Sequence, residues 1–465
     1  MKATMTLAWG LVAAAALTMP LVVSAQDDAP KQTLFTNVQI FDGVSEERLA
    51  GNVLIEGNLI KQISAEPIAA ANATVIDGGG RTLMPGLIEG HGHLQMNGIS
   101  LADIENNRNW EELAIRSAVN AEAALMSGFT TWRDAGGMGA GLRKTIDAGL
   151  VVGPRIYPSG EFIGPTGSHA DFRNFTTPNE SLNGPQSAGG RLGMTLTADS
   201  VDAIKAVARQ NFMQGATQVK IMSSGGVASQ FDPWQLDAYS AEEIRAVVEI
   251  ADAYGSYVMS HAYSKKSIMR CLENGVKTIE HGFMFDGDVA RLMKKNGAYM
   301  TTNMQAFSPL LSEVEAISAS AASTRKANSA QLAFKDYVEN VKKYRPKLGF
   351  QGDCIGLPAS CQKQNDHQIY LGAMFFGNHY YLKALTSVNG EIVKLSGRVL
   401  DPYPDGKLGV IEEEAYADIL LVDGNPLEDI TVIGGNEKWF DAPVRDGLET
   451  MRIIMKNGVI YKNTL

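Results

Sequence analysis

Two histidines stand one residue apart at the end of the apolar stretch Pro85-Gly86-Leu87-Ile88-Glu89-Gly90-His91-Gly92-His93. On a β-strand, the side chains of residues i and i+2 point to the same face. Both imidazoles can therefore aim at one point, as a metal ion requires. A single pair of this kind also occurs on surfaces without function, so its meaning depends on where the chain places its other histidines.

From Pro85 onward, short apolar runs alternate with helical patterns. This β-then-α rhythm predicts parallel strands joined by helical crossovers. About eight such units over roughly 300 residues fit an α/β fold of the (β/α)8 TIM-like barrel type. After the first strand, we expect strands at 128–134, 155–159, 218–222, 257–261, 278–281, 299–302 and 348–353, and helices at 114–126, 200–214, 242–254, 264–274, 288–296 and 312–343.

The two ends of the chain have β character instead. The first part includes a hairpin with Gly57-Asn58 as its turn, and Asn457-Gly458 marks another hairpin near the end. We expect residues 26–84 and 399–465 to form one small discontinuous β-sandwich domain beside a barrel of residues 85–398. Two unrelated β segments are the alternative.

Residues 1–25 have the pattern of a secretory signal peptide, with an apolar run over 7–23 and Val23-Ser24-Ala25 as the cleavage site. A membrane anchor is the alternative interpretation. No other run approaches the roughly 18 apolar residues of a membrane span. The pattern predicts a periplasmic or secreted protein that has no membrane attachment after the signal is cleaved.

The composition limits the class of partner. Hydrophobic residues make up 45% of the 465, enough for a packed core, and the formal net charge is −10. An acidic chain disfavours a nucleic-acid partner, which would require a basic face. Among the three cysteines, only Cys354 and Cys361 are close in sequence. The sequence is compatible both with a disulfide between them and with free buried thiols.

Four of the seven histidines lie at the carboxyl ends of expected barrel strands, where a barrel gathers its chemistry. Asp353 also ends such a strand, and Lys220 lies near the end of another. Burial of Lys220 would favour its neutral amine, which can react with carbon dioxide to give a carbamate that reaches two ions. A lysine that extends to solvent is the alternative. The four histidines are His91, His93, His261 and His281.

These motifs resemble the amidohydrolase superfamily, in its imidazolonepropionase-like and Xaa-Pro dipeptidase branch. The resemblance is carried by residues 85–93, 128–134, 219–222, 260–263, 279–282, 352–353 and 417–427. It implies a barrel with a flanking β-sandwich and a site for two Zn²⁺ or other divalent ions. By position, His91, His93 and Asp353 would hold the buried ion. His261 and His281 would hold the outer ion, with carboxylated Lys220 as the bridge.

Within this branch, the chain resembles exported bacterial enzymes that remove a C-terminal residue from dipeptides or N-acyl amino acids, including enzymes that split ochratoxin A into phenylalanine and an isocoumarin acid. The features are diffuse: residues 366–372, and 166–171, where relatives often carry Gly-His-Gly in place of Ser168-His169-Ala170. The resemblance implies attack of a metal-bridged hydroxide on a small amide or dipeptide, with Asp353 as general base and then acid. His169 is the candidate partner of the carbonyl oxygen or the substrate acid, and Tyr263 the candidate partner of a free carboxylate.

Two other functions stay open. A deaminase or cyclic-amide hydrolase can use the same scaffold, and a single bound metal ion per chain would favour the deaminase. A periplasmic metal-binding protein would take up zinc without hydrolysing any N-acyl amino acid.

We also expect a homo-oligomer, for which residues 171–191 could supply subunit contacts. Structural or peripheral roles are expected for four residues: His367, His379, Arg133 and Asp134.

Overall fold

The structure, a computed structural model, describes residues 30–96, 101–106, 108–229, 231–313, 315–318, 320–354, 361–438 and 448–465. The expected signal peptide lies outside these residues and stays a prediction. Among the described helices, none combines the length and the apolar character that crossing a membrane requires.

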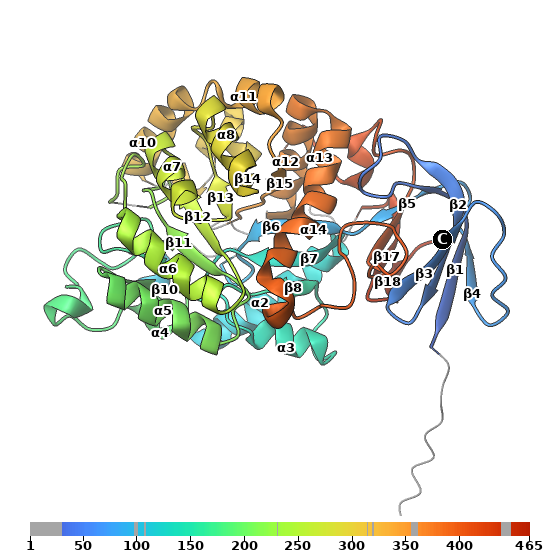
Figure 1. Cartoon of the computed structure of the whole chain (residues 1–465), viewed down its shortest axis with the longest axis horizontal. Coiled ribbons are helices and arrows are strands. Elements are labelled where there is room, and N and C mark those ends of the chain that lie inside the picture. The colour runs from blue at the N-terminus through green and yellow to red at the C-terminus, as the bar shows by residue number, and fades with distance from the viewer. Residues whose placement is uncertain are drawn as a thin grey trace, which may run out of the picture.

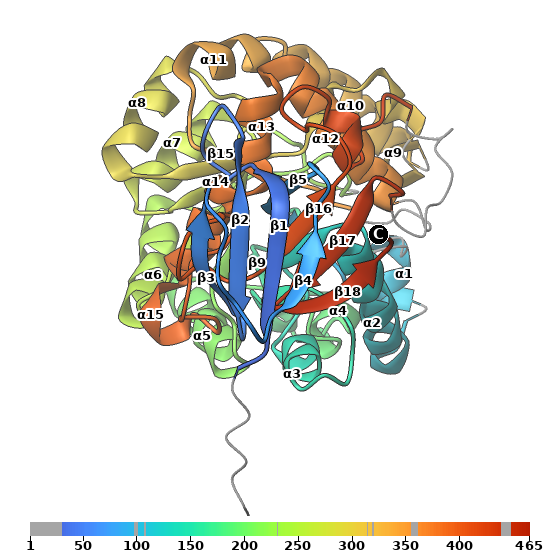
Figure 2. The same cartoon turned by 90° about the vertical axis from the view of Figure 1, so that its right-hand side faces the viewer.

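Strands from both ends of the chain form one eight-stranded sheet, which faces the viewer in Figure 2. The two ends meet where β5 (Thr82–Pro85) pairs antiparallel with β16 (Ile419–Val422). The expected hairpin turns at Gly57-Asn58 and Asn457-Gly458 are confirmed. The discontinuous β domain is confirmed too, and its other strands are β1 (Gln32–Ile40), β2 (Leu49–Glu56), β3 (Leu59–Ser64), β4 (Thr74–Asp77), β17 (Met451–Lys456) and β18 (Val459–Asn463).

This sheet has an apolar core of its own, to which both ends contribute. Phe35, Val53 and Leu83 from the first part are fully buried together with Ile419 and Ile453 from the last part. Burying apolar area between segments so far apart in sequence explains why they form one unit. The domain boundaries themselves, at 84/85 and 398/399, stay predictions.

The middle of the chain forms the expected barrel, on the left of Figure 1. Three parallel strands form one sheet, and five more lie in a second parallel sheet. Two short strands that we did not expect, β9 (Phe162–Gly164) and β10 (Thr195–Thr197), extend the second sheet beside β11. The barrel strands are β6 (Leu87–Gly92), β7 (Phe129–Asp134), β8 (Arg155–Tyr157), β11 (Val219–Met222), β12 (Val258–Ala262), β13 (Thr278–His281), β14 (Tyr299–Thr302) and β15 (Leu348–Phe350).

Side-chain hydrogen bonds join the two sheets at both seams. Nε2 of Gln218, the residue just before β11, donates to the carbonyl of Tyr157 at the end of β8 at 2.9 Å. Nδ2 of Asn389 donates to the carbonyls of Ile88 at 2.8 Å and Phe350 at 3.0 Å, which connects β6 to β15. The (β/α)8 prediction is confirmed.

Helices surround the barrel strands in Figure 1. Ser200 is the N-cap of α5 (Val201–Met213), and Ser264 is the N-cap of α7 (Lys265–Glu273). The segment expected to be helical over 312–343 is largely helical but divided into several helices, and Ser320 starts one of them by accepting from the backbone N–H of Ser323. That segment contains η3 (Pro309–Glu313), α9 (Glu315–Ser318), α10 (Ala321–Ala333) and α11 (Tyr337–Tyr344).

The remaining helices are α1 (Leu101–Asn106), α2 (Trp110–Met126), α3 (Gly141–Asp147), α4 (Ala188–Arg191), α5 (Val201–Met213), α6 (Ala241–Ala253), α7 (Lys265–Glu273), α8 (Gly287–Asn296), α12 (Cys361–Phe376), α13 (Asn378–Leu385), α14 (Ser387–Val393) and α15 (Gly397–Leu400), with short 3-10 turns η1 (Glu180–Leu182), η2 (Met304–Phe307), η4 (Lys394–Ser396) and η5 (Ile430–Ile433).

Two of the three cysteines are paired. Cys354 and Cys361 form a disulfide, and Cys271 is a buried free thiol. The disulfide ties the residue after Asp353 to the start of α12.

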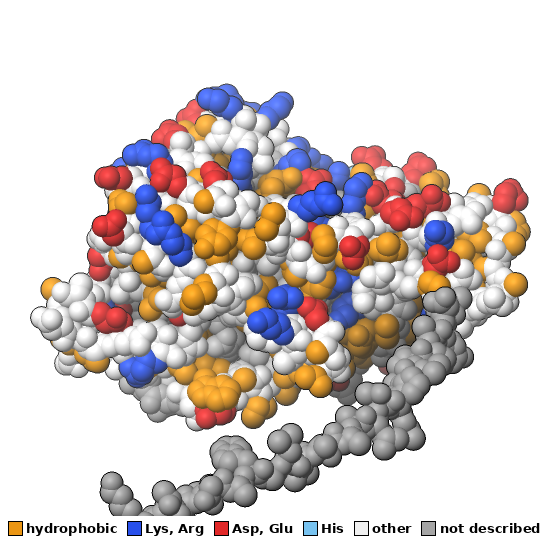
Figure 3. Space-filling view, turned by 60° about the horizontal axis from the view of Figure 1, so that its bottom comes forward, with side chains coloured by type: hydrophobic (Ala, Val, Ile, Leu, Met, Phe, Trp, Pro, Cys, Tyr) orange, Lys and Arg blue, Asp and Glu red, His pale blue; other side chains and the backbone are white. Residues whose placement is uncertain are grey.

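The charged side chains of the surface are mixed. On the face shown in Figure 3, Lys and Arg are scattered among Asp and Glu rather than gathered into one basic patch.

Candidate active site

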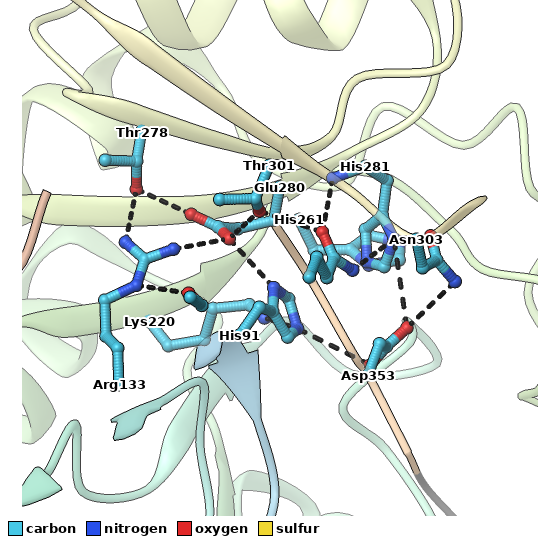
Figure 4. Close-up of polar contacts among 12 residues, drawn as sticks. His91, Arg133, Lys220, His261, Thr278, Glu280, His281, Thr301, Asn303 and Asp353 are labelled. Atoms are coloured by element: carbon cyan, nitrogen blue, oxygen red, sulfur yellow. Dashed lines mark hydrogen bonds and ion pairs between the residues drawn. The ribbon is translucent and has the colours of Figure 1, made fainter. Parts of the chain in front are cut away.

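The strand-end side chains that the sequence singled out meet in one pocket at the mouth of the barrel. Figure 4 shows how His91, Lys220, His261, His281 and Asp353 lie relative to one another. His93 lines the same pocket. The carboxyl ends of parallel strands lie at one end of a barrel, which explains how residues from distant parts of the chain come together.

The tightest group consists of His91, His93 and Asp353. One possible ligand atom from each lies within 4.8 Å of the others, and Nε2 of each histidine is 3.5 Å from Oδ1 of Asp353. The expected strand 348–353 ends earlier, at Phe350, and Asp353 has a left-handed φ of 51°. That bend aims its carboxylate at the two rings. Two imidazoles and a carboxylate suit zinc or a similar divalent ion.

The second ring nitrogen of each histidine is fixed by the barrel. Nδ1 of His91 lies 2.8 Å from Oε2 of Glu280, and Nδ1 of His93 lies 2.9 Å from the carbonyl of Gly136. Glu280 also accepts a hydrogen bond from Arg133 at 2.8 Å, and both side chains are fully buried. Contacts of this kind orient imidazoles that bind a metal ion through Nε2. Arg133 thus holds the carboxylate that contacts His91, which is compatible with the structural role predicted for it.

Lys220 lies beside the same group. Its Nζ is 3.3 Å from Nε2 of His91, and the residue is only 1% exposed. Burial lowers the pKa of Lys220 to about 8, although the charges of Glu280 and Asp353 act in the opposite direction. The alternative of a solvent-exposed lysine is wrong. The neutral amine is much more abundant here than in an exposed lysine, and carbamate formation requires that amine.

His261 and His281 complete the ring of imidazoles, with their centroids 4.5 Å apart. Nδ1 of His281 is 3.9 Å from Oδ2 of Asp353 and 3.0 Å from Oδ1 of Asn303. Nε2 of His261 is 3.0 Å from the carbonyl of Gly225. Burial lowers the pKa of both histidines, so both rings are neutral and have a lone pair for a metal ion.

Asp353 is a carboxylate in spite of its burial. Burial alone would raise its pKa, but the hydrogen bond with His93 and the electrostatic interactions with His281, His93 and Lys220 outweigh that effect and lower the pKa. Nδ2 of Asn303 also donates to Oδ2 of Asp353 at 3.3 Å. The group is thus ionised and able to accept a proton.

His169 and Tyr263 line the same pocket. The ring of His169 stacks on His261 at 4.3 Å, and its Nδ1 lies 2.8 Å from Oγ of Ser229, which leaves Nε2 for a bound molecule. The ring of Tyr263 lies 4.6 Å from His261. Burial and the charge of Asp353 raise the pKa of Tyr263, so its hydroxyl stays protonated.

The model of the amidohydrolase family matches residues 82–347, more than half of the chain. This span contains all of the metal-site candidates except Asp353. The chain belongs to the amidohydrolase family. The predicted superfamily and the predicted class of enzyme, a hydrolase, are confirmed.

The amidohydrolase is similar to two solved structures, a prolidase and a Xaa-Pro dipeptidase. One is a prolidase complexed with N-methylphosphonate-L-proline, at 32% identity over 93% of this chain and 100% of that chain, with a TM-score of 0.80. The other is a Xaa-Pro dipeptidase with methionine bound in its active site, at 27% identity over 93% and 100% of the two chains, with a TM-score of 0.77. Both likenesses agree with the predicted branch.

A third relative is the ochratoxinase of Aspergillus niger, which is 29% identical over 289 residues. That alignment covers 60% of this chain and 60% of the ochratoxinase. The amidohydrolase thus matches about three-fifths of the length of this curated relative.

The rest of the pocket of this amidohydrolase is mostly apolar. Phe283 and Phe334 stack at 4.3 Å above Tyr263, whose ring is 5.0 Å from Phe283. Among the described lining residues, Lys220 and Asp353 are the only ones with a lysine, arginine or acidic side chain. The other apolar lining residues are Phe162, Phe172, Met222, Val227, Ala228, Ala306, Leu311, Ile317, Ala327 and Ala330.

Sequence reasoning missed Glu280 as a site residue. A charged residue inside a predicted barrel strand is a usable signal, because a buried charge must have partners. His367 and His379 lie elsewhere: His367 contacts Oγ of Ser308, and His379 contacts the carbonyl of Val44. Neither lines the pocket, in agreement with the peripheral role expected for them.

Proposed function

We propose that this amidohydrolase hydrolyses an amide bond and releases a C-terminal amino acid from N-acyl amino acids or dipeptides. Ochratoxin A, an amide of phenylalanine, is one candidate substrate. The observation that carries the proposal is the meeting of the histidines, Lys220 and Asp353 beside an apolar pocket. The similarity to a Xaa-Pro dipeptidase and to an ochratoxinase supports the two substrate classes.

The donor set fits two divalent metal ions, most simply Zn²⁺. His91, His93 and Asp353 would hold the first, and His261 and His281 the second, with the carbamate of Lys220 between them. The buried amine at 3.3 Å from His91 supports the bridging role. When bound, the ions supply a water of lowered pKa and polarise the substrate carbonyl.

Asp353 moves the proton in this proposal. It accepts a proton from the attacking water, whose oxygen bonds to the carbonyl carbon, and returns that proton to the nitrogen as the carbon–nitrogen bond breaks. The products are a carboxylic acid and an amine. Nε2 of His169 hydrogen-bonds the carbonyl oxygen or the substrate acid, and the hydroxyl of Tyr263 donates to a free carboxylate.

The pocket also favours one kind of side chain. Apart from Lys220 and Asp353, no described lining residue has a lysine, arginine or acidic side chain. A charged side chain of the substrate would therefore be buried without an opposite charge, which is costly. An aromatic or large aliphatic group instead gains contact with Phe283 and Phe334. Substrates with a bulky uncharged side chain should therefore react fastest.

The test is a release assay with the zinc-loaded protein. N-acyl derivatives of phenylalanine, leucine, lysine and aspartate, a set of dipeptides and ochratoxin A are incubated with the enzyme, and the freed amino acid is identified. We expect release of phenylalanine and leucine well ahead of lysine and aspartate. No release from any member of the panel would refute the proposed function.

Two variants test the assigned roles. Asp353→Asn should lose nearly all activity, and hydrolysis at the wild-type rate with full metal content would contradict the acid–base role. Lys220→Ala should lose most of the bound metal, and retention of two ions per chain would contradict the bridging role. Arg325→Met, an exposed change outside the site, is the control for both.

The localisation and the oligomeric state of the protein are proposals as well. The leader pattern supports export to the periplasm or the medium, and we propose a homo-oligomer that binds no nucleic acid. Mass determination of the secreted mature protein by light scattering tests the assembly, and sequencing of its N-terminus tests the cleavage after Ala25.

A further inference from the structure

Helix α10 inserts an ammonium group into the loop that follows β11. Nζ of Lys326 lies 2.7 Å from the carbonyl of Gly226, 2.5 Å from that of Ser229 and 2.9 Å from that of Asp232. An ammonium has three protons, so these three carbonyls satisfy it fully. The side chain is only 14% exposed. Lys326 therefore acts on the loop and does not face solvent.

The same loop carries the partner of His169. Oγ of Ser229 lies 2.8 Å from Nδ1 of His169 and 3.4 Å from Nζ of Lys326. Gly226 packs so closely against the imidazole that a Cβ there would lie 2.1 Å from Cε1 of His169. Oδ2 of Asp232 accepts from the backbone N–H of Gly226 at 2.6 Å and so closes the loop on itself. The loop thereby sets the position of the His169 ring.

Helix α10 also forms part of the pocket wall. Ala327 and Ala330 of this helix and Phe334 at its C-cap line the pocket. Lys326 thus connects two parts of the mouth that are about 100 residues apart in sequence. One part shapes the apolar pocket, and the other orients His169.

We propose that Lys326 is a positioning residue for His169. By binding three carbonyls of the loop, it holds Ser229 in place, and Ser229 holds Nδ1 of His169 so that Nε2 serves the substrate. The catalytic consequence rests on the proposed function. The coupling between Lys326 and the loop does not, because it concerns the structure of the protein alone.

The test combines kinetics with hydrogen–deuterium exchange on the zinc-loaded full chain. Lys326→Met keeps the length of the side chain and removes all three donors. We expect kcat/KM for an N-acyl-phenylalanine to fall about tenfold or more, because small displacements of an orienting group are costly. Exchange in peptides covering residues 222–229 should become faster. Arg325→Met, the neighbouring exposed cation, should change neither measurement.

A double-mutant cycle decides whether Lys326 acts through His169. In a His169→Asn background, Lys326→Met should cost less than about twofold further, because the group it positions is gone. An equal loss in both backgrounds would overturn the proposal. Ser229→Ala is the second variant, which breaks the contact to His169 and leaves the three carbonyl bonds of Lys326 in place. It should reproduce the kinetic loss, and wild-type kinetics for Ser229→Ala would also overturn the proposal.

The two hypotheses fail in different ways. If the wild-type protein hydrolyses no member of the panel, the proposed function fails and the exchange measurement still decides the coupling. Unchanged exchange at 222–229 in Lys326→Met would then overturn the positioning role.

Discussion

Replacing Glu280 with glutamine should weaken both the fold and metal binding. The carboxylate accepts hydrogen bonds from the hydroxyls of Thr278 and Thr301, each at 2.6 Å. It also accepts one from Arg133 at 2.8 Å and lies 2.8 Å from Nδ1 of His91. Glutamine keeps the volume but leaves the fully buried guanidinium of Arg133 without its counter-charge. Loss of one partner of a buried ion pair costs on the order of 3–5 kcal/mol. Urea unfolding of the metal-free protein measures this loss.

A second variant, Arg133→Met, isolates the contribution of the Arg133–Glu280 ion pair to the free energy of unfolding. Arg133→Met should be destabilising by a similar amount, because it leaves the carboxylate unpaired, but the double variant should lose clearly less than the sum of the two. Additivity to within about 0.5 kcal/mol would refute the reasoning. Glu280→Gln should also weaken zinc affinity by about 10- to 100-fold, because it removes the carboxylate that orients His91. Arg133→Met keeps that carboxylate and is the matched control in a chelator-competition titration.

Three further predictions concern other parts of the chain. The double variant Cys354→Ser/Cys361→Ser should lose about 2–3 kcal/mol of unfolding free energy, as expected for a short disulfide loop, and urea unfolding that matches the wild type would contradict this. Phe334→Ala should lower kcat/KM by roughly fivefold more for N-acyl-phenylalanine than for N-acyl-alanine, because an aromatic contact is worth about 1 kcal/mol, and equal losses for both substrates would contradict it. Burial raises the pKa of Glu161 from 4.5 to about 7, so the folded state binds the extra proton between these values and stability falls as the pH rises through this window. Glu161→Gln should remove that slope and be more stable than the wild type at pH 8 by on the order of 2–3 kcal/mol, which urea unfolding at pH 5 and pH 8 measures.

Much of the fold could be predicted from the sequence because its signals are local. The alternation of strands and helices predicted the barrel, and Gly57-Asn58 and Asn457-Gly458 marked two hairpins. The break of the expected helix at Ser320 was harder to predict, because it depends on a serine that competes for the backbone N–H of Ser323. The strands β9 and β10 have three residues each and are too short for a periodic pattern.

The metal-site candidates could be predicted because they lie in or shortly after barrel strands, and the barrel brings the carboxyl ends of those strands together. The partners of these residues could not. The contact of His91 with Glu280 spans 189 positions, and that of His169 with Ser229 spans 60. Such pairs depend on which side chains face each other in the finished mouth. The pocket wall from α10 was missed for the same reason, because its alanines are ordinary helix residues until the helix is placed.

The pairing of β5 with β16 also sets an order of events during biosynthesis. β5 leads through Gly86 straight into β6, the strand of His91, and the backbone N–H of Gly86 donates to the carbonyl of Asp418 at 2.9 Å. Asp418 is translated roughly 330 residues after Gly86. Strand pairings between segments so far apart in sequence form slowly. The pairing of β5 with β16 therefore cannot form until β16 has left the ribosome. If the predicted leader directs export of an unfolded chain, this pairing forms only after β16 has crossed the membrane.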